Sequence, residues 1–160
     1  MLYEITQFLD AAHAVDAAAR GVFRLNFAIE LFALHLRNLL DFFAPRKNVR
    51  KTDAIARYFC PVWRAPELNA HLTEARLMAD KQIAHLTTSR TTDITAKEWA
   101  IEPILYSMIP LIEKFAREAE RVSEGFRAEV SDQIAEAPPK KRWSELPPQM
   151  SVATRLERRI

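Results

Sequence analysis

Glycine and cysteine are almost missing from this chain of 160 residues. Its 2 glycines are too few for the turns of a β-sandwich or barrel, or for the loops that cradle nucleotide phosphates. The single cysteine, Cys60, excludes a disulfide within the chain and fits a reducing compartment. These scarcities favour an all-α fold and a cytoplasmic location, and we expect no cofactor.

Signals for export, membrane insertion and metal binding are missing as well. The N-terminal segment carries acidic residues early and has no basic stretch, unlike a signal peptide. Charged residues interrupt every apolar run well before the roughly 18 residues of a membrane span. No HExxH or CxxC occurs, and no Glu-x-x-His pair of the kind that holds two metal ions in helical bundles. We therefore expect neither a membrane span nor a bound metal.

The stretch 22–43 (VFRLNFAIELFALHLRNLLDFF) organises the rest of the chain. It contains neither Gly nor Pro, and apolar residues fall on nearly every side of it. At about 100° per residue, Phe27 and Leu34 share one side while Phe32 and Leu39 lie opposite. A helix that is apolar all round is normally enclosed by neighbours, so this pattern predicts the central helix of a bundle. The core residues predicted from this helix and the next long one are Phe27, Leu34, Leu40 and Ile83.

Three further helices are predicted from apolar residues at helical spacing. Their expected ranges are 2–20, 66–87 and, after a capping box of Thr95 and Glu98, 95–126 with a polar extension to 137. A basic connector, a helical turn at 53–57 and an aromatic loop at 58–63 follow the central helix, and the loop is expected to pack over the bundle. The predicted fold is an all-α bundle of four or five helices over residues 1–137.

Residues 138–160 differ in composition from that domain. The segment PPKKRWSELPPQM holds four prolines, and residues 138–160 carry six basic and two acidic side chains. Such a Pro-rich basic tail favours extended structure and builds no core of its own. The preceding 137 residues hold 17 basic and 19 acidic side chains, so the domain as a whole shows no electrostatic footprint for nucleic acid.

Polar residues on the two central helices are the candidates for a functional site. Arg37 and Asn38 are adjacent on the central helix, and His85 lies on the third. One interpretation is that they are solvated flank residues in helix-spaced ion pairs, which contribute little energy. The other is that Arg37, Asn38 and His85 converge across a groove between the two helices.

Two segments carry a resemblance to a known family. LHLRNLLDFF (34–43) and ADKQIAHLTTSR (79–90) resemble segments of small, uncharacterised bacterial helical proteins that are loosely similar to the HEPN superfamily. The resemblance implies a bundle of four or five helices. Many HEPN proteins are metal-independent ribonucleases of toxin and defence systems, and others are binding modules. Catalytic members place a histidine within about two helical turns after an arginine, but Phe42, Phe43 and Ala44 occupy those positions here.

We therefore expect a non-catalytic interaction or regulatory module that binds a protein partner or self-associates, as a dimer for example, with RNA as a further candidate partner. The alternative implied by the resemblance is a metal-independent ribonuclease. In it His85 would act as general base, Arg37 would stabilise the charge on the phosphorane, and Asn38 would orient the phosphate. A third candidate is a small-ligand pocket under the 58–63 aromatic cluster.

Overall fold

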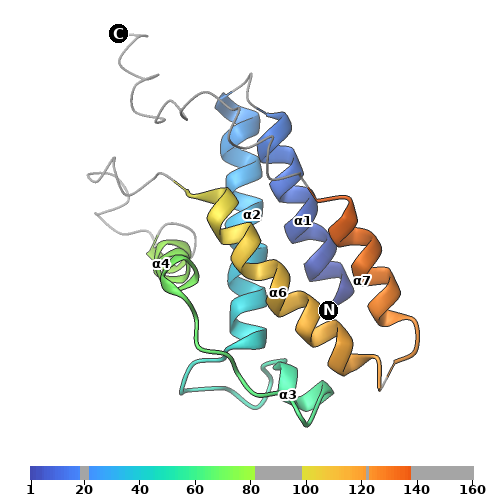
Figure 1. Cartoon of the computed structure of the whole chain (residues 1–160). Coiled ribbons are helices and arrows are strands. Elements are labelled where there is room, and N and C mark those ends of the chain that lie inside the picture. Colours follow the sequence, from blue (N-terminus) through green and yellow to red (C-terminus); the bar gives the residue numbers. More distant parts are fainter. Residues whose placement is uncertain (19–21, 82–98, 122, 138–160) are drawn as a thin grey trace, which may run out of the picture.

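The computed structural model describes residues 1–18, 22–81, 99–121 and 123–137 (Figure 1). These residues form helices and connecting segments and include no β-strand. The all-α class expected from the sequence is therefore confirmed. The helices are α1 (Leu2–Ala17), α2 (Val22–Phe43), α3 (Ala56–Phe59), α4 (Ala70–Ala79), α6 (Ile101–Ala119) and α7 (Phe126–Ala135).

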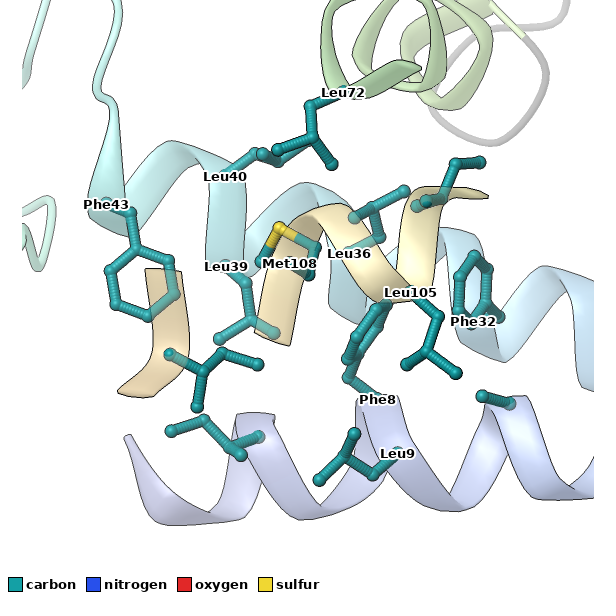
Figure 2. Packing of buried hydrophobic residues seen from close by; sticks show 14 of the residues in the cluster. Phe8, Leu9, Phe32, Leu36, Leu39, Leu40, Phe43, Leu72, Leu105 and Met108 are labelled. Carbon is teal, nitrogen blue, oxygen red and sulfur yellow. The ribbon is translucent and has the colours of Figure 1, made fainter. Parts of the chain in front are cut away.

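The helix α2 has the bounds predicted from the sequence, and among the described residues it contributes as many buried apolar side chains to the core as α6 does. Figure 1 shows α1 and α2 side by side, with α6 crossing in front of both, α7 packed against α6 and α1, and α4 on the other side of α2 from α1. Phe8 of α1 stacks on Phe32 of α2 with their ring centroids 4.8 Å apart. Figure 2 shows part of the apolar cluster that these helices share, with the members Phe8, Leu9, Phe32, Leu36, Leu39, Leu40, Phe43, Leu72, Leu105 and Met108 labelled.

The core residues predicted on α2 are only partly confirmed. Leu40 is fully buried, as expected, but Phe27 is 58% exposed and Leu34 is 38% exposed. The helices α1, α4 and α6 contact the sides of α2 that carry Phe32, Leu36, Leu39 and Leu40, and leave Phe27 and Leu34 outside. Ile83, the fourth predicted core residue, lies outside the described residues.

An aromatic cluster closes the bundle where α2 ends. The rings of Phe42, Phe43 and Trp63 surround Phe115 of α6, at centroid distances of 5.1, 5.5 and 5.6 Å. The Trp63 indole also donates a 2.8 Å hydrogen bond to the main-chain carbonyl of Phe43. The predicted packing of the 58–63 loop over the bundle is thus confirmed for Cys60 and Trp63, which are buried. Tyr58, Phe59 and Val62 of the same segment are more than half exposed, although the Phe59 ring contacts the Phe42 ring at a centroid distance of 5.8 Å.

Several helix ends differ from the predicted ones because side chains cap them. The helix α4 begins at Ala70 and not at Pro66, since the Asn69 side chain accepts a 3.0 Å hydrogen bond from the Leu72 N–H. The helix α6 ends at Ala119, before the predicted end at 126. The chain then turns at Gly125, whose φ of 85° suits glycine. The Glu120 carboxylate accepts hydrogen bonds from the main-chain N–H groups of Gly125 and Arg127, so α7 starts as a separate helix.

Some predicted features lie outside the described residues. They are the capping box of Thr95 and Glu98, the end of the third helix near 87, and the basic tail 138–160. Within the described part of the chain, every helix is too short or too polar to cross a membrane.

Candidate binding site

A cavity of about 670 Å³ lies where α2 ends, bordered by the start of α1 and by the connector Ala44–Ile55. Arg37 and Asn38, two of the three site residues predicted from the sequence, both line it. The third, His85, lies outside the described residues. Arg46 and Arg50 of the connector also line the cavity, and the sequence analysis assigned neither of them to a site.

Arg37 and Asn38 each bind a carboxylate from another helix. The Arg37 Nε–H donates to Asp80 Oδ1 over 3.1 Å, and the Asn38 amide donates to Glu4 Oε2 over 3.1 Å. Neither partner was predicted, because Asp80 and Glu4 are 43 and 34 residues away along the chain. Arg37 and Asn38 therefore hold α2 to the end of α4 and the start of α1, as well as lining the cavity.

Three arginines share two carboxylates beside the cavity. Asp80 accepts hydrogen bonds from Arg37 and Arg46, and Asp41 lies 3.5 Å from Arg46 Nε and 3.3 Å from Arg76 Nη2. The hydrogen bond to Asp80, with the nearby charges of both carboxylates, raises the pKa of Arg46 although partial burial opposes the shift. Because arginine is always protonated in proteins, this network of three guanidinium groups and two carboxylates carries one positive charge in excess.

Arg76 has a structural position within this network. Its Nη2 donates to the main-chain carbonyls of Leu40 over 2.6 Å and of Ala44 over 2.7 Å, at the C-terminal end of α2. The last carbonyls of a helix have no partner within it, and the Arg76 guanidinium supplies one to the Ala44 carbonyl. The Leu40 carbonyl also accepts a 2.9 Å hydrogen bond from the Ala44 N–H. Burial lowers the pKa of Arg76, against the opposing charges of Asp41 and Asp80.

Glu4, which accepts a hydrogen bond from Asn38, also pairs with His35 of α2. The His35 Nδ1 lies 2.8 Å from Glu4 Oε2, and the Tyr3 ring stands edge-on to the His35 ring at 6.1 Å. Partial burial raises the pKa of Glu4, but the hydrogen bonds from His35 and Asn38 and the His35 charge outweigh burial and lower it overall. His35 is buried and does not line the cavity. We therefore assign it to positioning Glu4.

The chain from 44 to 65 forms a surface that we call the basic–aromatic corner, at the end of the bundle around α3 (Figure 1). It carries six exposed basic side chains and a single acidic one, Asp53; the basic residues are Arg46, Lys47, Arg50, Lys51, Arg57 and Arg64. Elsewhere in residues 1–137, acidic side chains outnumber basic ones by 18 to 11. The net charge of residues 1–137 is near zero and conceals this local excess of basic residues, which is evident when charges are counted over a short window of the sequence.

Apolar side chains are exposed at the same corner. Tyr58, Phe59 and Val62 are each more than half exposed. The Arg57 guanidinium lies over the Tyr58 ring at 5.7 Å from its centroid. The buried neighbours Ala56, Cys60 and Trp63 alternate with them and fix this short segment to the bundle.

The described part of the chain contains no candidate metal site. No three His, Cys, Asp or Glu side chains gather there in a way that could hold an ion. One histidine, His13, instead contacts the main-chain carbonyl of Glu136 and links α1 to the end of α7.

Comparison with known proteins adds no relative. No family model, no curated protein and no solved structure matches this chain.

Proposed function

We propose that this protein is a non-catalytic interaction module of the cytoplasm that binds an acidic, partly apolar segment of another protein at the basic–aromatic corner. The observation that carries this proposal is the exposure of Tyr58, Phe59 and Val62 within five residues of one another, among arginines and lysines. Aromatic residues and arginine are the residue types enriched in protein interfaces and in their energetic hot spots.

The corner is also well prepared for binding. Cys60 and Trp63 are buried, and the Trp63 indole is hydrogen-bonded to Phe43 and lies under the Lys114 ammonium at 4.8 Å. The exposed side chains are therefore presented by a backbone that is already fixed. A partner that docks on such a surface loses less free energy to ordering than one that must fold a loop.

Charge supports an acidic protein partner over a second copy of this chain. In a symmetric dimer the same surface of both subunits meets, so a dimer through the corner would bring two basic surfaces together. An acidic partner gains from the same charge, which speeds encounter and disfavours wrong partners.

RNA is a weaker fit to the same surface. Exposed aromatics beside arginines do suit single-stranded nucleic acid, whose bases stack on such rings. The acidic excess over the rest of residues 1–137 would, however, repel a polyanion that extends beyond the corner. Pro61 and Val62, both exposed, offer aliphatic surface and not a stacking platform.

A defined pair of probes tests the proposal. Fluorescence anisotropy would compare a labelled peptide of alternating Glu and Leu or Trp residues with a labelled uridine oligonucleotide of similar length. We expect the acidic peptide to bind the protein and Phe59→Ser to weaken that binding about tenfold or more, as for a hot-spot residue. Phe27→Ser is the matched control, because Phe27 is equally exposed but lies on α2 away from the corner. Tighter binding of the oligonucleotide, or equal losses in the two variants, would contradict the proposal.

The metal-independent ribonuclease is retained as a second candidate, because Arg37 and Asn38 do line a cavity. Against it, both side chains donate to carboxylates of their own chain, which occupy donors that a phosphate would need. The assay is cleavage of a mixed RNA substrate in EDTA by the purified protein and by His85→Ala. We expect no cleavage, and metal-independent cleavage that disappears in the variant would overturn the non-catalytic proposal.

A further inference from the structure

The cavity beside α2 has the size and lining of a small-ligand site. Its volume of about 670 Å³ falls within the range of pockets that enclose small molecules. Its lining combines apolar side chains from the end of α2 and the connector, namely Phe42, Pro45, Val49 and Ile55, with guanidinium and carboxylate groups. Tyr58, Phe59 and Val62 do not line it. The cavity therefore shares Arg46 and Arg50 with the basic–aromatic corner but not its exposed apolar side chains, so a substitution of those side chains tests the two ligands apart.

The acidic groups of the lining already have partners. Glu4 accepts from His35 and Asn38, Asp41 pairs with Arg46 and Arg76, and Asp53 accepts from the main-chain N–H of Arg50 over 2.8 Å. Guanidinium and carboxylate groups are equal in number on the lining, three of each. This count of charges therefore does not predict whether the ligand is an anion or a cation. The prediction depends on which charged side chains still have hydrogen-bonding groups free to bind a ligand.

Arg50 is the group with unused donors. Only its main-chain N–H is bonded, and its guanidinium has no partner among the residues that the structure describes. Arg46, four residues earlier on the connector, pairs with Asp80 and Asp41 in a network with one positive charge in excess. Lys47 and Lys51 are exposed on the same connector. The side of the cavity formed by the connector is therefore positive.

We infer that this cavity binds a small organic anion, whose phosphate or carboxylate group pairs with Arg46 and Arg50 and whose apolar part lies against Pro45 and Val49. Planar guanidinium groups bind both phosphate and carboxylate through paired N–H donors. The structure therefore indicates an oxyanion, and experiment must distinguish a phosphate from a carboxylate. The apolar lining favours an anion with a hydrocarbon or aromatic portion over a bare inorganic ion.

Calorimetric titration at low ionic strength tests the inference with three related probes: phenyl phosphate, benzoate and benzylamine. We expect phenyl phosphate or benzoate to bind saturably and the cationic benzylamine not to bind. The better anion of the two identifies the source of the oxyanion. Saturable binding of benzylamine alone, or of neither anion, would overturn the inference.

Two variants with the same charge change locate the binding. Arg50→Gln should weaken binding of the better anion about tenfold or more, the loss expected for charge-assisted hydrogen bonds. Arg64→Gln removes a charge from the same corner but not from the cavity lining, and it should leave the affinity within about twofold. Equal losses in the two variants would show diffuse attraction and refute a built site.

The inference and the proposed function can fail separately. Phe59→Ser, which should weaken peptide binding about tenfold or more, should change the affinity for the anion far less than Arg50→Gln does. Phe59 does not line the cavity and approaches it only through its ring contact with Phe42. A loss of anion binding in Phe59→Ser as large as that in Arg50→Gln would place the anion on the exposed side chains of Tyr58, Phe59 and Val62 and overturn the assignment to the cavity.

Discussion

Two leucines on α2 allow a sharp test of the packing. Leu40 is fully buried against the apolar cluster, whereas Leu34, six positions earlier on the same helix, is 38% exposed. Figure 2 shows Leu40 pointing toward Leu72 of α4. Replacing either leucine by alanine makes the same chemical change in the same helix. Any difference in stability between the variants therefore reports packing and not helix propensity.

The expected costs differ severalfold. Removal of a fully buried leucine side chain loses its transfer free energy and leaves a cavity, which together cost about 2–5 kcal/mol. At Leu34 more than a third of the side chain already faces water, and a truncated side chain leaves a surface depression and no closed cavity. The loss there should be about 1 kcal/mol, from the apolar area that it still buries.

Urea unfolding followed by circular dichroism measures both losses. With a slope of about 2 kcal/mol per molar urea, Leu40→Ala should lower the midpoint by about 1–2.5 M and Leu34→Ala by about 0.5 M or less. An unchanged slope in each variant would show that the shifts reflect stability. Equal shifts in the two variants would refute the arrangement in which α1, α4 and α6 cover one side of α2 and leave the other open.

Three further predictions concern polar groups and the tail. Arg76→Met removes the side-chain donor of the Ala44 carbonyl and the ion pair with Asp41. It should cost about 1–3 kcal/mol in urea unfolding, against about 0.5 kcal/mol or less for the exposed control Arg57→Met. The lowered pKa of Glu4 stabilises the fold above its ordinary value of 4.5, and this contribution is lost as the pH falls through the lower folded-state value. The difference in urea midpoint between the protein and Glu4→Gln should therefore shrink from about pH 6 to about pH 3. Deletion of residues 138–160 should leave a helical protein that melts cooperatively, because the prolines and charges of the tail leave few groups to bury; loss of cooperative melting would contradict this.

The bounds of α2 could be predicted because the signals that end a helix are local. Gly21 precedes the helix, Pro45 follows it, and no breaker lies between them. Which side of the helix is buried is not a local property. The spacing of Phe27, Leu34, Phe32 and Leu39 shows only that the helix has apolar residues on opposite sides. Burial depends on where other helices pass, and these come from distant parts of the chain.

The missed helix ends show a different limit. Asn69 is a favourable N-cap residue directly before α4, and the sequence contained that signal. Pro66 also suits a first turn, so the sequence offers two competing start signals three residues apart. The cap of α7 had a weaker signal, since Glu120 lies in the predicted fourth helix and reaches the N–H groups of Gly125 and Arg127 only after the chain turns back.

Part of the candidate site could be predicted from the sequence. Arg37 and Asn38 stand out as polar residues on an apolar helix, and both line the cavity. Arg46 and Arg50 looked like ordinary residues of a basic connector, because their role depends on how the connector folds against the end of α2. The partners of Arg37 and Asn38 depend on the tertiary fold as well, so a motif of neighbouring residues could not include them.

The cavity and the basic–aromatic corner share one support, the connector that runs from Ala44 to Ile55. Arg76 and the end of α2 hold its first residue through the Ala44 carbonyl. Its last residue, Ile55, is buried, lines the cavity and immediately precedes α3. The backbone that forms one wall of the cavity therefore also sets the position of Tyr58 and Phe59. An interface residue contributes most to affinity where it is held in place before binding. The ion pairs and hydrogen bonds of Arg76 therefore support binding at the basic–aromatic corner, although Asp41 and Asp80 lie outside residues 44–65.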